Sequence, residues 1–123
     1  MKGSIIAAVA LAGVTLASSA YADGDAVAGK SVFNKCAICH SPAPGKNGVG
    51  PTLFGIVGRQ SASVAGFSYS EAMKAANKTW DEATLDTYLT DPKAMVPGTK
   101  MIFPGLPKPE DRANVIAYLA TLK

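Results

Sequence analysis

Hydrophobic side chains recur at helical spacing near the end of the chain, from about Pro109 to Leu122. Glu110 and Asp111 would occupy the first turn of this segment, where negative side chains interact favourably with the helix dipole. The apolar positions that would share one face are Val115, Ile116, Tyr118, Leu119 and Leu122. The pattern predicts an amphipathic helix over residues 109–122, and it is the clearest helical signal in the chain.

Two weaker helical patterns lie earlier in the sequence. Over residues 26–35, Val27, Val32 and Phe33 form a moderately defined apolar face, which favours a short helix there. Residues 70–76 are also compatible with a helix, in which a methionine such as Met73 is usually a core side chain. We therefore expect a short helix at each of these places.

A further helix is predicted to begin close to residue 79. Thr79 and Glu82 have the spacing of a capping box, in which Thr79 is the N-cap and Glu82 lies at N3. The apolar face of this helix would be formed by Leu85, Tyr88 and Leu89. Asp91 and Pro92 would end it and begin a short turn of another helix, because proline fits the first helical turn but not the interior.

Long stretches rich in proline and glycine separate these segments. Residues 41–52 contain three prolines and three glycines, and residues 96–109 contain four prolines and two glycines, so neither is expected to be regular structure. Loops of this length are uncommon in a compact domain unless they have a function of their own. No segment alternates clearly enough to predict a sheet. The sequence therefore predicts an all-α domain with short helices and long loops that wrap around a ligand.

The first 22 residues have the composition of a secretory signal peptide. Lys2 supplies the positive start, residues 5–16 form an apolar run, and Ala20 and Ala22 fit the small-x-small cleavage pattern. The alternative is an uncleaved anchor, because residues 3–22 are a run of 20 uncharged residues. That run is rich in alanine, glycine and serine rather than leucine, which favours a cleaved signal peptide, export, and a single mature domain over residues 23–123.

The mature chain has few large hydrophobic residues for its size. Of its 101 residues, 21 are Leu, Ile, Val or Phe, which is close to the level at which chains struggle to fold unaided. Domains this small usually need additional stabilisation, and a large apolar cofactor would provide it. One histidine and two cysteines are too few for an all-protein zinc centre, and 11 basic against 9 acidic side chains do not indicate nucleic-acid binding.

The sequence Cys36-Ala37-Ile38-Cys39-His40 has the C-x-x-C-H spacing of a c-type haem attachment site. Both thiols can add to the haem vinyl groups, and the adjacent imidazole can then ligate the iron. A thioredoxin-like cysteine pair would require a βαβ context, which this chain lacks. A structural disulfide is the other alternative, but its loop would be too short to stabilise the domain much. The motif therefore favours one covalently attached haem c.

The iron ligand opposite His40 would distinguish a haem enzyme from an electron carrier. His40 is the only histidine, so the candidates are a methionine, a lysine or an open position. The methionines of the mature chain are Met73, Met95 and Met101. Met73 and Met95 fall where a methionine is ordinary core filling, whereas Met101 lies in the proline- and glycine-rich loop without a helical packing role.

The chain resembles class I cytochromes c of the mitochondrial and bacterial cytochrome c2 type over essentially the whole mature sequence. The matching stretches are Cys36–His40, Gly50-Pro51-Thr52-Leu53, Gly58-Arg59, Gly66-Phe67-Ser68-Tyr69, Thr79-Trp80 and Pro97-Gly98-Thr99-Lys100-Met101-Ile102-Phe103. The resemblance implies the small cytochrome c fold around one covalent haem, with His40 and Met101 as the axial ligands of the iron.

The resemblance also implies roles for residues around the haem. The Pro51 carbonyl would accept the Nδ1 proton of His40, which leaves Nε2 to ligate the iron. A haem propionate would be compensated by Arg59, Tyr69 and Trp80. The sulfur of Met101 would lie near Tyr88. Thr99, in the same loop as Met101, would be a further cofactor-binding residue. Gly29 and Phe33 would cross the last helix near Ile116 and Tyr118.

By the same resemblance, positive side chains would surround the exposed haem edge: Lys35, Lys46, Lys93, Lys100 and Lys108. Such an arrangement steers encounters with acidic redox proteins, either a reductase and an oxidase or a reaction centre. The implied function is a soluble, monomeric periplasmic electron carrier, without catalytic residues, nucleic-acid binding or stable membrane insertion after cleavage. The alternative is a haem enzyme such as a peroxidase, or a gas sensor, each of which needs an open sixth position.

Overall fold

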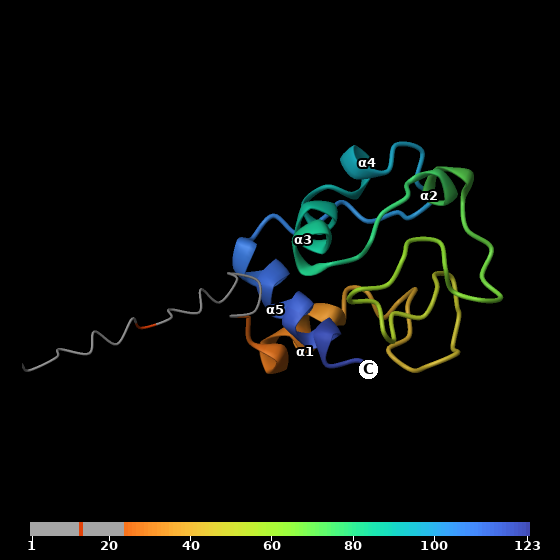
Figure 1. Ribbon diagram of the computed structural model, residues 1–123. Coiled ribbons are helices and arrows are strands. Elements are labelled where there is room, and N and C mark those ends of the chain that lie inside the picture. The colour runs from red at the N-terminus through yellow and green to blue at the C-terminus, as the bar shows by residue number, and fades with distance from the viewer. Residues whose placement is uncertain (1–12, 14–23) are drawn as a thin grey trace, which may run out of the picture.

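Five helices and long connecting loops make up the part of the chain that the computed structural model describes, Gly13 and residues 24–123 (Figure 1). The helices are α1 (Ala26–Phe33), α2 (Glu71–Ala75), α3 (Glu82–Thr90), α4 (Pro92–Met95) and α5 (Pro109–Ala120). The described residues contain no strand, only an isolated antiparallel bridge between Gln60 and Thr79. The prediction of an all-α domain is confirmed, while the predicted signal peptide lies, Gly13 aside, outside the described residues.

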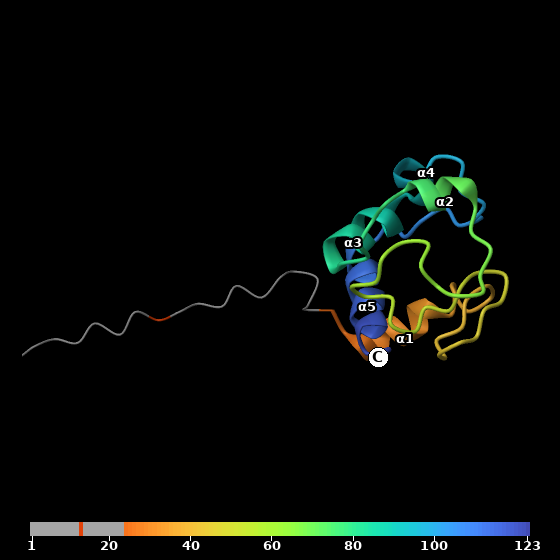
Figure 2. The same cartoon turned by 45° about the vertical axis from the view of Figure 1, so that its right-hand side comes forward.

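Helices α1 and α5 cross at close range, and both views show them in contact although they lie at opposite ends of the sequence (Figures 1 and 2). Gly29 is buried at the crossing, where a Cβ atom would overlap the backbone oxygen of Asn114 and lie 2.9 Å from Cβ of Tyr118. The rings of Phe33 and Tyr118 are 5.2 Å apart beside it. The predicted crossing at Gly29 and Phe33 is confirmed, and only a residue without a side chain fits it.

The start of α3 differs from the predicted capping box. The N-cap is Asp81, whose carboxylate accepts a hydrogen bond from the backbone N–H of Thr84 at 2.7 Å. This hydrogen bond lowers the pKa of Asp81. Thr79 lies outside the helix, because its backbone pairs with Gln60 and its hydroxyl bonds the Gln60 side chain at 3.4 Å. The prediction that Thr79 caps the helix was therefore wrong: bridge formation holds it in an extended segment.

The two long segments predicted as loops are irregular, except that Pro109, the last residue of the second, begins α5. Residues 41–52 and 96–108 are irregular, and in both views residues 41–70 lie below α2 and α4 (Figures 1 and 2). Buried Thr52 organises the first loop by donating its hydroxyl hydrogen to the carbonyl oxygen of Ala43 at 2.6 Å. Asn47 then ties this loop to the next one, because its side chain accepts from Thr52 N–H at 3.0 Å and donates to the Ala65 carbonyl oxygen at 3.3 Å.

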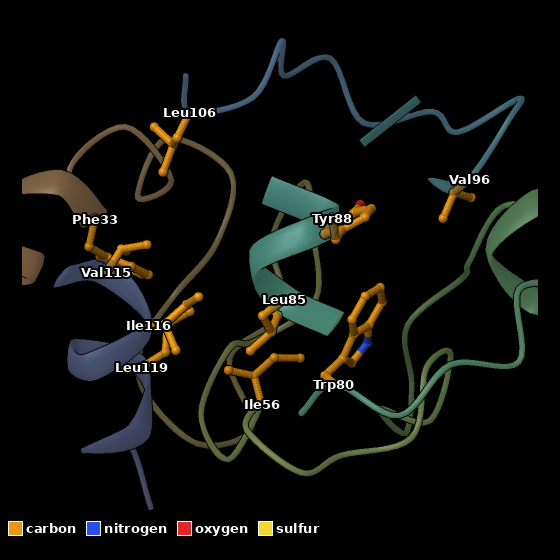
Figure 3. Packing of buried hydrophobic residues seen from close by; sticks show 10 residues of the cluster. All are labelled: Phe33, Ile56, Trp80, Leu85, Tyr88, Val96, Leu106, Val115, Ile116 and Leu119. Atoms are coloured by element: carbon orange, nitrogen blue, oxygen red, sulfur yellow. The ribbon is translucent and has the colours of Figure 1, made fainter. Parts of the chain in front are cut away.

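The hydrophobic core lies between α5, α3 and the loops that precede α3. Leu85 of α3 points toward the α5 side chains, and Trp80 lies beside Tyr88 with ring centroids 4.8 Å apart (Figure 3). The buried hydrophobic residues are Phe33, Ile56, Trp80, Leu85, Tyr88, Val96, Leu106, Val115, Ile116 and Leu119. This small core leaves one side of α3 and α5 facing a cavity instead of other side chains.

Candidate functional site

A cavity of about 390 Å³ lies inside the loops. Cofactor sites in proteins commonly measure about 300–1,000 Å³ and are lined mainly by hydrophobic side chains. The apolar walls here are Val49, Leu53, Ile56, Phe67, Met73, Leu85, Leu89, Ile102, Phe103, Val115 and Leu119. The same cavity is lined by every cofactor- or metal-binding residue predicted from the sequence: Cys36, Cys39, His40, Pro51, Arg59, Tyr69, Trp80, Tyr88, Thr99 and Met101.

The two cysteines reach the cavity from hydrogen-bonded turns that follow α1. Cys36 N–H donates to the Phe33 carbonyl at 2.7 Å, and His40 N–H donates to the Cys36 carbonyl at 2.9 Å. These turns place the three side chains of the motif along one wall. Both cysteines are free, so the structure does not pair them as a disulfide. Burial raises the pKa of the Cys36 thiol, with a smaller opposing effect from Lys35.

His40 is held in one orientation. Its Nδ1 lies 2.7 Å from the carbonyl oxygen of Pro51, which is the hydrogen bond that the sequence resemblance implied. With Nδ1 as the donor, Nε2 keeps its lone pair for a metal. Burial lowers the pKa of His40, against the effect of the Pro51 carbonyl, and this favours the neutral imidazole. The ring packs on Gly50, where a Cβ atom would overlap the imidazole.

Met101 enters the cavity from the loop between α4 and α5. Its sulfur lies 3.7 Å from the hydroxyl of Tyr88, and its backbone N–H donates to the Thr99 hydroxyl at 3.2 Å. Burial raises the pKa of Tyr88 to about 12, with a hydrogen bond to Thr99 acting in the opposite direction, so the phenol stays protonated near neutral pH. Met73 also lines the cavity from α2, whereas Met95 does not.

Arg59, Tyr69 and Trp80 line the cavity, and the side chains of Arg59 and Tyr69 also form hydrogen bonds with the backbone. The two terminal nitrogens of Arg59 each donate to a backbone carbonyl at 3.0 Å, one from Phe54 and one from Thr52. The Tyr69 hydroxyl accepts from Val64 N–H at 3.0 Å, so its proton is available to another acceptor. Desolvation lowers the pKa of Arg59, and nearby Tyr69 opposes that effect.

The predicted docking lysines divide into two groups. Lys35 and Lys100 are exposed and line the cavity. Three others are exposed without lining it: Lys46, Lys93 and Lys108. Together with Arg59, these two lysines give the cavity three positively charged side chains among residues that are mostly apolar.

Several polar residues of the cavity were not predicted from the sequence: Gln60, Ser68 and Ser70. Ala62 was missed as well, and it adopts a φ of 54°, a left-handed conformation that is uncommon for a residue other than glycine. Ser68 lies in a stretch that matches the family and Ser70 begins the segment predicted as a helix, but neither signal pointed to the cavity. No motif or periodicity singles out Gln60 or Ala62, which lie outside the helices. Phe103 ends the matching stretch that contains Met101, but no role was predicted for it.

These residues fit a covalently bound haem. Two thiols, an oriented neutral imidazole and a thioether sulfur meet in one apolar cavity, and sulfur and imidazole ligands suit iron. Arg59 and Tyr69 add polar groups that can compensate a carboxylate. The absence of a side chain at Gly50 keeps the space beside His40 open for the imidazole.

Comparisons with known proteins agree with this assignment. The sequence model of the cytochrome c family matches residues 26–123. Cytochrome c2 of Rhodomicrobium vannielii is 56% identical over 116 residues, covering 92% of this chain and 93% of that protein. Cytochrome c-554 of Methylosinus trichosporium is 53% identical over 114 residues, covering 92% and 86%.

Solved structures give the same result. The structure of cytochrome cH from Methylobacterium extorquens has a TM-score of 0.76 and 48% sequence identity, covering 80% of this chain and 99% of that one. The family match, the relatives and the geometry of the cavity lead to one conclusion: the chain belongs to the cytochrome c family and carries covalently bound haem c.

Proposed function

We propose that this protein is a periplasmic electron carrier whose haem iron is ligated by His40 and Met101. The observation that carries the proposal is the position of Met101, which lines the same cavity as Cys36, Cys39 and His40. Its sulfur faces the Tyr88 hydroxyl at 3.7 Å, which holds the thioether inside the cavity. A site closed by protein ligands suits a carrier better than an enzyme or a gas sensor, because both of those need an open position.

The chain's own residues determine how the site works. When bound, haem c supplies a one-electron Fe(II)/Fe(III) couple. Cys36 and Cys39 attach the cofactor, and Pro51 orients His40 through the 2.7 Å hydrogen bond. The apolar walls exclude water from the metal, and Tyr88 polarises the Met101 sulfur with its hydroxyl. His/Met ligation is associated with a raised reduction potential in cytochromes c.

The proposed location is the periplasm. Residues 1–22 have the features of a cleaved signal peptide, and haem attachment to two cysteines fits an exported protein. Within residues 24–123, no helix is both long enough and apolar enough to cross a membrane. We propose a monomer that meets its redox partners transiently.

Electron transfer to an acidic redox protein should depend on Lys35 and Lys100. Both are exposed at the cavity, and Coulomb attraction between exposed charges is screened over about 8 Å at physiological salt. We expect Lys35→Glu and Lys100→Glu each to slow the bimolecular rate about tenfold at low salt, with a smaller effect at high salt. Stopped-flow kinetics against an acidic redox protein, with the reduction potential measured in parallel, tests this.

Lys74→Glu is the control, because Lys74 lies on α2, is exposed and does not line the cavity. It should slow the reaction much less than either cavity variant. If Lys74→Glu and Lys35→Glu slow the bimolecular rate equally, net charge controls the rate, and not a docking surface at the cavity. A protein that transfers no electrons reversibly would contradict the proposed function itself.

A further inference from the structure

The loop that carries Met101 is firmly attached at its far end. The side chain of Leu106 is 1% exposed, and its backbone N–H donates to the Leu89 carbonyl at 2.7 Å. Gly105 packs so closely on the end of α3 that a Cβ atom would overlap the carbonyl oxygen of Thr90. Residues 105–106 therefore lie directly against the last turn of α3.

Arg112 completes this attachment from α5. Its Nη1 donates to the carbonyl oxygens of Leu106 at 2.8 Å and Pro107 at 3.2 Å, and its Nε donates to Asp86 Oδ1 at 2.8 Å. The ion pair is largely shielded from water, with side-chain exposures of 11% for Arg112 and 22% for Asp86. Charge-assisted hydrogen bonds are stronger than neutral ones, and shielding preserves their strength. One guanidinium thus joins α5, α3 and the loop.

Closer to Met101 the backbone contacts are local. Thr99 N–H donates to the Val96 carbonyl at 3.0 Å, and Met101 N–H donates to the Thr99 hydroxyl at 3.2 Å. Ile102, the next residue, is 99% exposed. Because these two hydrogen bonds join residues of one short segment, they do not fix that segment to the rest of the protein. Apart from the contact of its sulfur with the Tyr88 hydroxyl, Met101 is held in place through the two ends of the loop, and Arg112 with Asp86 holds one of them.

We infer that Arg112 and Asp86 are positioning residues for Met101, and that their ion pair determines how readily an external ligand replaces the Met101 sulfur on the iron. The inference rests on the proposed ligation by Met101. A ligand that binds only the open form has an apparent affinity reduced by the small population of that form. Weakening the attachment raises this population, so it should raise the affinity for an external ligand.

The test is imidazole binding to the oxidised holoprotein at neutral pH. We expect Arg112→Lys and Asp86→Asn each to keep the near-infrared sulfur-to-iron absorption without imidazole, yet to bind imidazole about tenfold more tightly than the wild type. Asp86→Glu, which keeps the charge, should lie closer to the wild type than Asp86→Asn. Glu71→Gln is the matched control, because it breaks an exposed ion pair with Lys74 on α2, and its affinity should stay within about twofold of the wild type.

Global unfolding by guanidinium, measured on the same variants, separates positioning from general stability. Imidazole affinities that match the wild type in both Arg112→Lys and Asp86→Asn would overturn the inference, even if unfolding became easier, because the ion pair would then be only structural. In that case the ligand role of Met101 would stand. A wild type without the sulfur-to-iron absorption would instead overturn the assignment of Met101, and this inference with it.

Discussion

Replacing Met101 with alanine should remove the near-infrared sulfur-to-iron absorption of the oxidised protein and lower its reduction potential. The cavity offers no second histidine, and the Met101 sulfur is positioned by the Tyr88 hydroxyl at 3.7 Å. Without this sulfur the iron becomes accessible, so imidazole should bind at least about tenfold more tightly because it no longer displaces a protein ligand. Absorption spectroscopy, potentiometry and an imidazole titration measure the three effects.

Two methionine controls make this test specific. Met95→Ala changes a side chain of α4 that does not line the cavity, and it should leave the absorption in place. Met73→Ala changes a cavity-lining methionine on α2, and it should also retain the absorption. If either control loses the band while Met101→Ala keeps it, the sixth ligand has been assigned to the wrong methionine.

Gly29→Val should strongly destabilise the protein although position 29 does not line the haem cavity. A Cβ atom at position 29 would overlap the Asn114 backbone oxygen and lie 2.9 Å from Cβ of Tyr118, so α1 and α5 would have to separate. We expect a loss of about 3 kcal/mol in the free energy of unfolding, at the upper end of the usual cost of overpacking. Guanidinium unfolding of the purified holoprotein measures it.

Ser31→Val adds the same kind of side chain at an exposed position of the same helix, so it is the control for helix propensity. Its cost should be below about 1 kcal/mol. Gly29→Ala should fall between the two, because its Cβ is already too close to Asn114. Equal stabilities for Gly29→Val and Ser31→Val would show that the helix crossing tolerates a side chain.

The sequence predicted the parts of the site that depend on short motifs. The cysteine spacing and the adjacent histidine gave the haem attachment site, and the proline-rich loop separated Met101 from the other methionines. The resemblance added the Pro51 hydrogen bond to His40, which the structure contains at 2.7 Å. Each of these signals lies within a few neighbouring residues, and that is why sequence reasoning could detect them.

Features that depend on the folded chain were missed. The capping box at Thr79 was predicted from spacing alone, but pairing with Gln60 keeps Thr79 extended and leaves Asp81 as the cap. Asp86 and Arg112 are 26 residues apart, so no local pattern links them before α3 and α5 pack together. Tertiary packing decides both cases, and local propensity cannot anticipate it.

Exposure of the reduced wild-type protein to carbon monoxide tests the central claim most directly. If His40 and Met101 both ligate the iron, the haem has no open position, and the absorption spectrum should stay unchanged at neutral pH. Met101→Ala, measured alongside, should bind the gas and show that binding is detectable. Ready binding of carbon monoxide by the wild type would contradict a closed electron carrier and would favour a haem enzyme or a gas sensor.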